Sequence, residues 1–128
     1  MKKMLTAALL VAAFAGQALA GYKSTNPVVV NTTTKTAYGS MGSARASADT
    51  TQFIGCELFG GPGGPTTVNC GARNSAFQVV YCSSTDPAVV AMAYGLTANS
   101  YLYFRADANG RCSYLNIDNA SYEQPVTP

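Results

Sequence analysis

Residues 99–122 read NSYLYFRADANGRCSYLNIDNASY, and this stretch decides the fold. Two runs rich in aromatic and branched residues, 101–106 and 112–117, flank the tetrapeptide Asp107-Ala108-Asn109-Gly110. Asp and Asn side chains close turns by accepting backbone hydrogen bonds, and glycine tolerates the positive φ that tight turns need. The stretch therefore predicts a β-hairpin with strands at 101–106 and 112–117.

The two strands of this hairpin have different faces, because successive side chains of a strand point to opposite sides. Leu102 and Phe104 share one face, and Leu115 and Ile117 can join them across the ladder. This pattern predicts one buried face and one face that carries tyrosines. The candidate surface-binding residues on the second face are Tyr101, Tyr103, Tyr114 and Arg105.

A row of tyrosines on a sheet has two interpretations. Tyrosine offers a flat ring with a polar tip, so such a row can stack on sugars or anchor a protein partner. The alternative is that these tyrosines are only good cross-strand neighbours on a partly covered sheet. The sequence leaves both interpretations open.

The first 20 residues have the pattern of a secretory signal peptide. Lys2 and Lys3 precede an apolar run at 4–15, and Ala18-Leu19-Ala20 is a small-x-small cleavage site. The apolar run is too short for a membrane span, and no later run approaches the roughly 20 apolar residues that a span needs. We therefore expect cleavage near Ala20 and export to the periplasm, the cell surface or the medium, without a transmembrane segment.

Charge restricts the class of partner. Cleavage would remove Lys2 and Lys3 from the 8 Lys and Arg, which leaves six to balance the 6 Asp and Glu. No cluster of basic residues remains to neutralise phosphates, so nucleic acid is not an expected partner. A surface with few charges and no net charge resists association poorly. The expected partner is therefore an unknown macromolecule or a second copy of the chain, as a homo-oligomer.

All four cysteines follow the predicted signal peptide, and an even number in an exported chain predicts two disulfides. Metal binding is disfavoured because no two cysteines have C-x-x-C spacing and the chain has no histidine. The turn-forming block at 60–65, GGPGGP, lies midway between Cys56 and Cys70 and favours their pairing, which leaves Cys82 for Cys112. A pairing of Cys70 with Cys82 is nearly as symmetric and stays open.

The rest of the chain predicts further strands at 50–59, 66–73 and 77–82, and a single helix. Asp86 is a good N-cap, Pro87 suits the first helical position, and Gly95 can end a helix over 87–94. The expected fold is mainly β: a small antiparallel β-sheet domain, sandwich-like or a meander, with one short helix near 87–94 and two disulfides. Residues 21–128 have the length of a single domain.

An extended N-terminal arm is expected at residues 21–40. Val28-Val29-Val30 and Thr32-Thr33-Thr34 favour strand geometry. Because the amides and carbonyls of an extended segment need partners, the arm should add a strand to a sheet. We expect this pairing within the same molecule, with pairing between molecules as the alternative.

The residues needed for common catalytic sites are missing. Without histidine neither a Ser-His-Asp nor a Cys-His site can form, and disulfide-bonded cysteines are not nucleophiles. We therefore expect a non-enzymatic exported β-domain that acts by surface recognition or self-assembly, with no cofactor and no metal. The alternative is a small carboxylate-dependent hydrolase of extracellular polysaccharide. Its candidate acids are Glu57, Asp107, Asp118 and Glu123.

Overall fold

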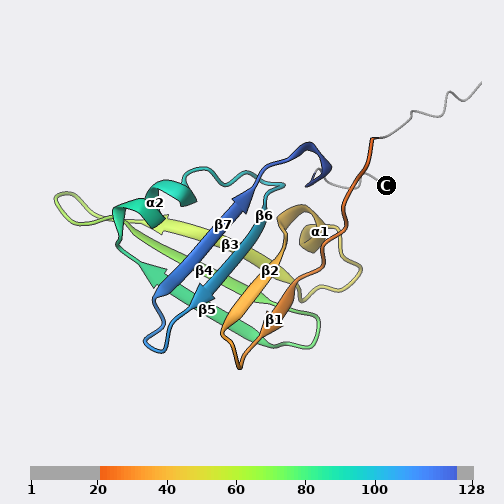
Figure 1. The fold of residues 1–128 in the computed structure, drawn as a ribbon, viewed down its shortest axis with the longest axis horizontal. Helices are drawn as coiled ribbons and strands as arrows, with labels where there is room; N and C mark the ends of the chain where they lie inside the picture. The colour runs from red at the N-terminus through yellow and green to blue at the C-terminus, as the bar shows by residue number, and fades with distance from the viewer. Residues whose placement is uncertain (1–20, 124–128) are drawn as a thin grey trace, which may run out of the picture.

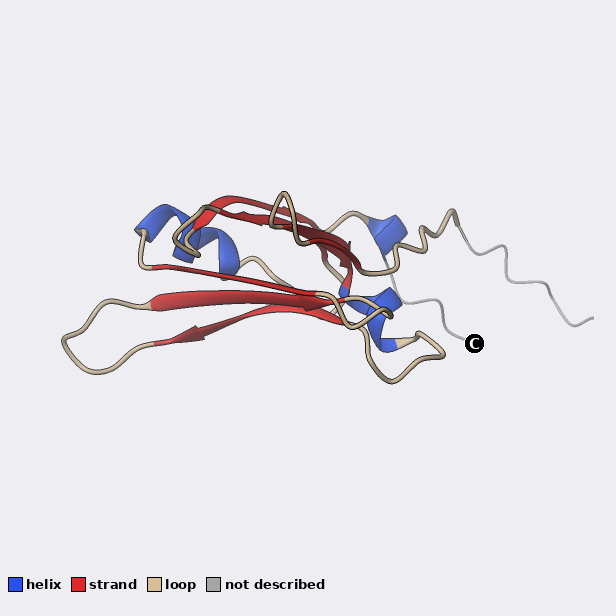
Figure 2. Ribbon diagram, turned by 90° about the horizontal axis from the view of Figure 1, so that it is seen from below, coloured by secondary structure: helices blue, strands red, loops and turns tan. Residues whose placement is uncertain are grey.

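The computed structural model describes residues 21–123, so the predicted signal peptide lies outside the described residues. Within them the chain forms two antiparallel sheets, one of four strands and one of three. Seen edge-on, the sheets lie one above the other as two layers, with the helices at their ends (Figure 2). The prediction of a mainly β, sandwich-like fold with two disulfides is confirmed.

The four-stranded sheet is built around the predicted hairpin, and its strand order is β1-β2-β6-β7 (Figure 1). In the turn of the hairpin, Asp107 Oδ1 accepts hydrogen bonds from the amides of Asn109 and Arg111, both at 2.8 Å, and Gly110 has a φ of 77°. The turn chemistry read from the sequence is therefore confirmed. The strands are β1 (Val29–Asn31), β2 (Thr36–Ser40), β6 (Tyr101–Ala106) and β7 (Cys112–Asp118).

The three-stranded sheet has the order β3-β4-β5, so its strands follow one another along the chain. Each lies where a strand was predicted, with ends that differ by up to three residues. Cys56 and Cys70 are directly opposite in the ladder of β3 and β4 and form the favoured disulfide. The strands are β3 (Phe53–Phe59), β4 (Thr67–Arg73) and β5 (Val79–Ser84).

The core lies between the two sheets. Leu102 and Phe104 are completely buried and face Ile117 and Leu115 across the ladder, as the alternation predicts. Val68 is the largest completely buried side chain from the opposite sheet. Removing these branched and aromatic side chains from water, at roughly 25 cal/mol per Å², is the main force that holds the layers together.

The predicted N-terminal arm folds back on its own molecule. β1 pairs with β2, and Val28 and Val30 are buried while Val29 is exposed. However, 21–40 is not one extended arm, and Thr32-Thr33-Thr34 is not a strand. Asn31 Oδ1 accepts hydrogen bonds from the amides of Thr33 and Thr34, both at 3.0 Å, and this side-chain closure produces a turn instead.

The predicted helix is confirmed as α2 (Pro87–Ala93). Asp86 caps it by accepting a 2.8 Å hydrogen bond from the amide of Ala88, and the amide of Gly95 donates to the carbonyl of Met92 after its end. Two shorter helical turns, α1 (Met41–Arg45) and η1 (Ser121–Glu123), were not predicted. No helix in residues 21–123 is long and apolar enough to cross a membrane.

The two sheets are also joined covalently. The second favoured disulfide, Cys82 to Cys112, connects β5 with the first residue of β7. Beside it, the amide of Ser83 donates a 3.0 Å hydrogen bond to the carbonyl of Gly110. The β6–β7 turn is therefore fixed to the end of the other sheet.

Candidate binding surface and polar cleft

Four tyrosines form a continuous row on the outer side of the four-stranded sheet. The alternation of β6 turns Leu102 and Phe104 inward, so its tyrosines point outward. The register places Tyr38 of β2 directly opposite Tyr103 and thereby adds it to the row. We call this row, which consists of Tyr38, Tyr101, Tyr103 and Tyr114, the tyrosine face.

The rings of the tyrosine face support one another. Tyr38 and Tyr103 are stacked with centroids 6.0 Å apart, and Tyr103 meets Tyr114 edge to face at 5.5 Å. Tyr38 and Tyr101 lie at 6.5 Å in a tilted arrangement. These are the separations and orientations that aromatic pairs prefer. Little side-chain entropy therefore remains to be lost when a ligand covers the rings.

A shallow hollow of about 280 Å³ lies in this surface. The guanidinium carbon of Arg105 is 6.0 Å from the ring centroid of Tyr114, and within residues 21–123 this guanidinium makes no hydrogen bond or ion pair. Burial, followed by the neighbouring Tyr38, raises the pKa of Tyr101 above its ordinary value. The hollow is lined by Tyr101, Tyr103, Arg105, Tyr114 and Asn116.

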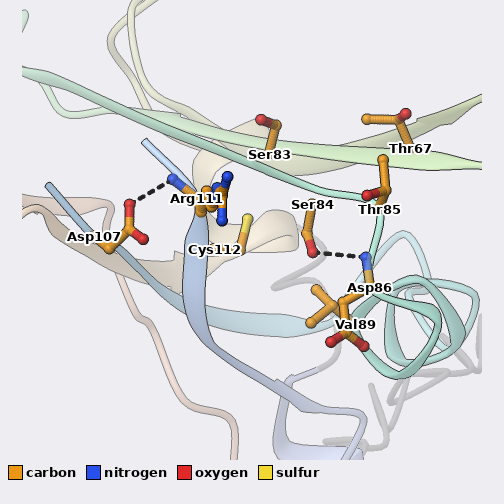
Figure 3. Close-up of a pocket in the computed structure, with 9 residues that line it drawn as sticks. All are labelled: Thr67, Ser83, Ser84, Thr85, Asp86, Val89, Asp107, Arg111 and Cys112. Atoms are coloured by element: carbon orange, nitrogen blue, oxygen red, sulfur yellow. Dashed lines mark hydrogen bonds between the residues drawn. The ribbon is translucent and has the colours of Figure 1, made fainter. Parts of the chain in front are cut away.

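A second, larger cavity of about 610 Å³ lies where the end of β5, the start of α2 and the β6–β7 turn meet. We call it the polar cleft. Figure 3 shows Arg111 and Asp107 on one side of it, and Ser84, Asp86 and Val89 on the other. The remaining lining residues are Thr67, Ser83, Thr85 and Cys112.

The carboxylates of the polar cleft already have structural roles. Hydrogen bonds from the backbone amides of Arg111 and Asn109 hold the pKa of Asp107 below its ordinary value, and Asp86 caps α2. The guanidinium of Arg111 and three hydroxyl groups form no hydrogen bond in the described part of the chain. These hydroxyls belong to Thr67, Ser83 and Thr85. The cleft therefore offers donors and acceptors to a polar molecule.

The four candidate acids of the hydrolase hypothesis have separate structural roles. Asp107 closes the turn at one end of β7 and Asp118 lies at the other end, which at about 3.4 Å per residue is a separation of roughly 20 Å. Glycosidases need two carboxyl groups at about 5 to 9.5 Å. Glu123 is buried and accepts hydrogen bonds from Ser40 and Asn26. Glu57 accepts one from Asn69 on the three-stranded sheet.

No family model matches the chain, and no curated protein or solved structure matches it. The functional inference therefore depends on the geometry. The structure brings all four predicted surface residues to one face and adds Tyr38. The sequence analysis did not predict Tyr38 as a surface residue. It lies in the short strand β2, whose sequence TAYGS identifies neither the strand with which it pairs nor the face to which Tyr38 points.

Proposed function

We propose that this protein is a non-enzymatic binding domain that works outside the cytoplasm and recognises a neutral glycan through the tyrosine face. The observation that supports the proposal is a row of four mutually packed tyrosines beside an arginine whose guanidinium, apart from its contact with Tyr114, has no partner in residues 21–123. The two disulfides are consistent with an oxidising compartment.

The residues around the hollow suit a sugar unit. A sugar ring has C–H groups on its faces and hydroxyl groups at its rim. Tyrosine rings can pack against the C–H groups, while Arg105 donates hydrogen bonds and Asn116 both donates and accepts them. Vicinal hydroxyl groups, which are donors and acceptors at once, match this combination.

The charge of the surface favours a neutral ligand. Arg105 is the one charged residue that lines the hollow, and it lies over the ring of Tyr114 instead of joining other cations. Anionic polymers are normally bound by clusters of Lys and Arg, which concentrate positive potential. A neutral polysaccharide requires no such cluster.

Intrinsic fluorescence tests the proposal directly, because the chain has 8 tyrosines and no tryptophan. The purified chain from Gly21 to Pro128 is titrated with soluble dextran, xylan, galactomannan and chitin oligosaccharides. We expect a saturable change with at least one of them, and about tenfold weaker binding in Tyr114→Ala, since losing an interface tyrosine costs about 1.4 kcal/mol or more.

The matched control is Tyr94→Ala, which removes an exposed tyrosine at the end of α2, away from the tyrosine face. We expect it to bind like the unmodified chain. The proposal is wrong if no polysaccharide binds or if both variants lose affinity equally. Release of new reducing ends that Asp107→Asn abolishes would favour the hydrolase instead. A mass that rises with concentration, without glycan binding, would favour self-assembly.

A further inference from the structure

Three cysteines form a row across the inner side of the three-stranded sheet. Cys70 of the central strand β4 is directly opposite Cys56 of β3 and directly opposite Cys82 of β5. Residues that are opposite one another in a ladder project to the same side. Cys70 therefore has two neighbours with which it can pair, although it is bonded only to Cys56.

The distances allow the second pairing. The Sγ atoms of Cys70, Cys82 and Cys112 all lie within 4.8 Å of one another. In a central strand, a residue forms the closer type of pair with one neighbour and the wider type, about 5.5 Å between Cα atoms, with the other. The Cα atoms of Cys56 and Cys70 are 4.0 Å apart, the closer type. The pair Cys70 and Cys82 is then the wider type, whose Cα separation of about 5.5 Å lies within the range of about 4.4 to 6.8 Å that disulfides span.

Burial divides the four sulfurs into two classes. Cys70 and Cys82 have 0% and 2% of their surface exposed, whereas Cys56 and Cys112 are only half-buried. A thiol from solution therefore reaches the sulfur of Cys56 or Cys112 first. Attack on Cys56 releases the thiolate of Cys70, and attack on Cys112 releases the thiolate of Cys82. In both cases the leaving thiolate is one of the two buried cysteines, which are opposite one another.

We propose that this row carries out thiol–disulfide exchange with low-molecular-mass thiols and ends with a Cys70–Cys82 disulfide. A thiolate attacks Sγ of Cys56, so that a mixed disulfide forms and the electron pair of the broken bond leaves on Cys70. The Cys70 thiolate then attacks Sγ of Cys82, which breaks the bond to Cys112 and leaves Cys112 as a thiolate.

A second thiol completes the reaction. Its thiolate attacks the sulfur of the first small thiol in the mixed disulfide, forms a small disulfide with it and releases Cys56 as a thiolate, which takes up a proton. In total, two small thiols are oxidised and the protein loses one of its two disulfides. Initial attack at Cys112 leads to the same product, because the Cys82 thiolate then attacks Sγ of Cys70 and releases Cys56.

The exchange has a consequence for the polar cleft, because Cys112 lines it (Figure 3). The disulfide between the sheets is replaced by one within the three-stranded sheet, and the thiol of Cys112 is released into the cleft. Cys112 thereby becomes a site of modification by small disulfides and other thiol-reactive compounds.

The test treats the folded chain from Gly21 to Pro128 with limiting reduced glutathione, blocks thiols with iodoacetamide and maps the products by proteolysis and mass spectrometry. We expect alkylated Cys56 and Cys112 together with a peptide pair linked through Cys70 and Cys82. Simple reduction, with alkylation of Cys56 and Cys70 alone or of Cys82 and Cys112 alone, would overturn the proposal. Near-ultraviolet circular dichroism is recorded to verify that the chain remains folded.

Two matched variants test the exchange step without a reductant. Cys56→Ser leaves Cys70 without its partner, so alkylation should be divided between Cys70 and Cys112. Cys112→Ser leaves Cys82 without its partner, so alkylation should be divided between Cys82 and Cys56. A thiol confined to Cys70 in the first variant and to Cys82 in the second would overturn the proposal. Should either variant fail to fold, the glutathione experiment still decides.

Discussion

Each of the two sheets presents an arginine beside aromatic rings on its outer side, but the two arginines differ in their partners. On the three-stranded sheet, the guanidinium carbon of Arg73 is 5.3 Å from the ring centroid of Phe53, and Arg73 Nε donates a 2.7 Å hydrogen bond to the carbonyl of Thr51. On the four-stranded sheet, Arg105 contacts the ring of Tyr114. The guanidinium of Arg73 is thus held by a hydrogen bond to its own chain, whereas that of Arg105 makes no hydrogen bond within residues 21–123 and leaves all its donors for a ligand.

Packing reinforces this difference. A Cβ atom on Gly71 would lie 2.4 Å from Cε1 of Tyr81, so this ring covers the backbone of the three-stranded sheet where only glycine leaves room for it. Tyr81 is nevertheless 55% exposed, more than the 48% of Tyr114. Exposure of an aromatic ring therefore does not identify a binding surface. Hydrogen-bonding groups that the protein itself leaves unused are the better criterion.

The largest expected effect on stability concerns the two disulfides. Cys82–Cys112 joins the two sheets, whereas Cys56–Cys70 lies within the three-stranded sheet. In the chain-entropy model, a disulfide that closes a longer loop stabilises more, which gives about 3.6 kcal/mol for the separation of 30 residues and about 3 kcal/mol for that of 14. The variant Cys82→Ala with Cys112→Ala should therefore lose more unfolding free energy in urea than Cys56→Ala with Cys70→Ala. The reverse order would mean that the three-stranded sheet depends on its internal link more than the sandwich depends on the link between sheets.

The next effect tests the closed packing of the three-stranded sheet. Gly71→Ala should destabilise by roughly 1 to 3 kcal/mol, because the new methyl group displaces the ring of Tyr81. The control is Gly61→Ala, whose added Cβ meets no atom within 4 Å. In a Tyr81→Ala background the cost of Gly71→Ala should fall, as a double-mutant cycle in urea would measure. An unchanged cost would show that the ring is not the obstacle.

Replacing each of the two arginines should separate an effect on folding stability from an effect on glycan binding. Arg73→Ala should lose about 1 kcal/mol of unfolding free energy, because it removes a charged hydrogen bond to Thr51, and should leave glycan binding unchanged. Arg105→Ala should change stability by no more than about 0.5 kcal/mol but weaken glycan binding. Thermal melts and the fluorescence titration measure both quantities. If the two variants behave alike, the distinction between the two faces is wrong.

The sequence predicted best those features that depend on neighbouring residues. Alternating side chains around an Asp-Ala-Asn-Gly turn gave the β6–β7 hairpin almost to the residue, and the capping residue Asp86 located α2. Three threonines in a row also looked like a strand, because strand propensity takes no account of the side chain of Asn31, which closes a turn there. Local chemistry therefore predicted elements well except where a side chain competed with the ladder.

The candidate sites depended on pairing between distant segments and were predicted only in part. Tyr101, Tyr103 and Tyr114 belong to one hairpin, so alternation alone placed them together. Tyr38 joins them only because β2 pairs with β6, more than 60 residues later in the chain. The polar cleft needs three separate segments and the Cys82–Cys112 link. No short sequence pattern carries that information.

The smallest expected effect compares two carboxylates that close turns, Asp49 before the three-stranded sheet and Asp107 within the β6–β7 turn of the four-stranded sheet. Asp49 precedes β3 and accepts hydrogen bonds from the side chain and amide of Gln52 and from Thr51, which hold its pKa far below the ordinary value of about 3.9. Asp107, in the β6–β7 turn, has a pKa that is lowered chiefly by the amide of Arg111. NMR titration of the side-chain carboxyl carbons should therefore find that Asp49 protonates at lower pH than Asp107.

Because both pKa values are lower in the folded chain, the ionised carboxylates favour folding. Their contribution is fully present above about pH 5, where the carboxylates of the unfolded chain are also ionised, and is lost as the pH falls through the lowered folded values. Asp49→Asn should therefore flatten the decline of melting temperature below pH 4 more than Asp107→Asn does. If Asp107→Asn flattens the decline more, the four-stranded sheet, and not the entry into the three-stranded sheet, contains the more acid-sensitive turn.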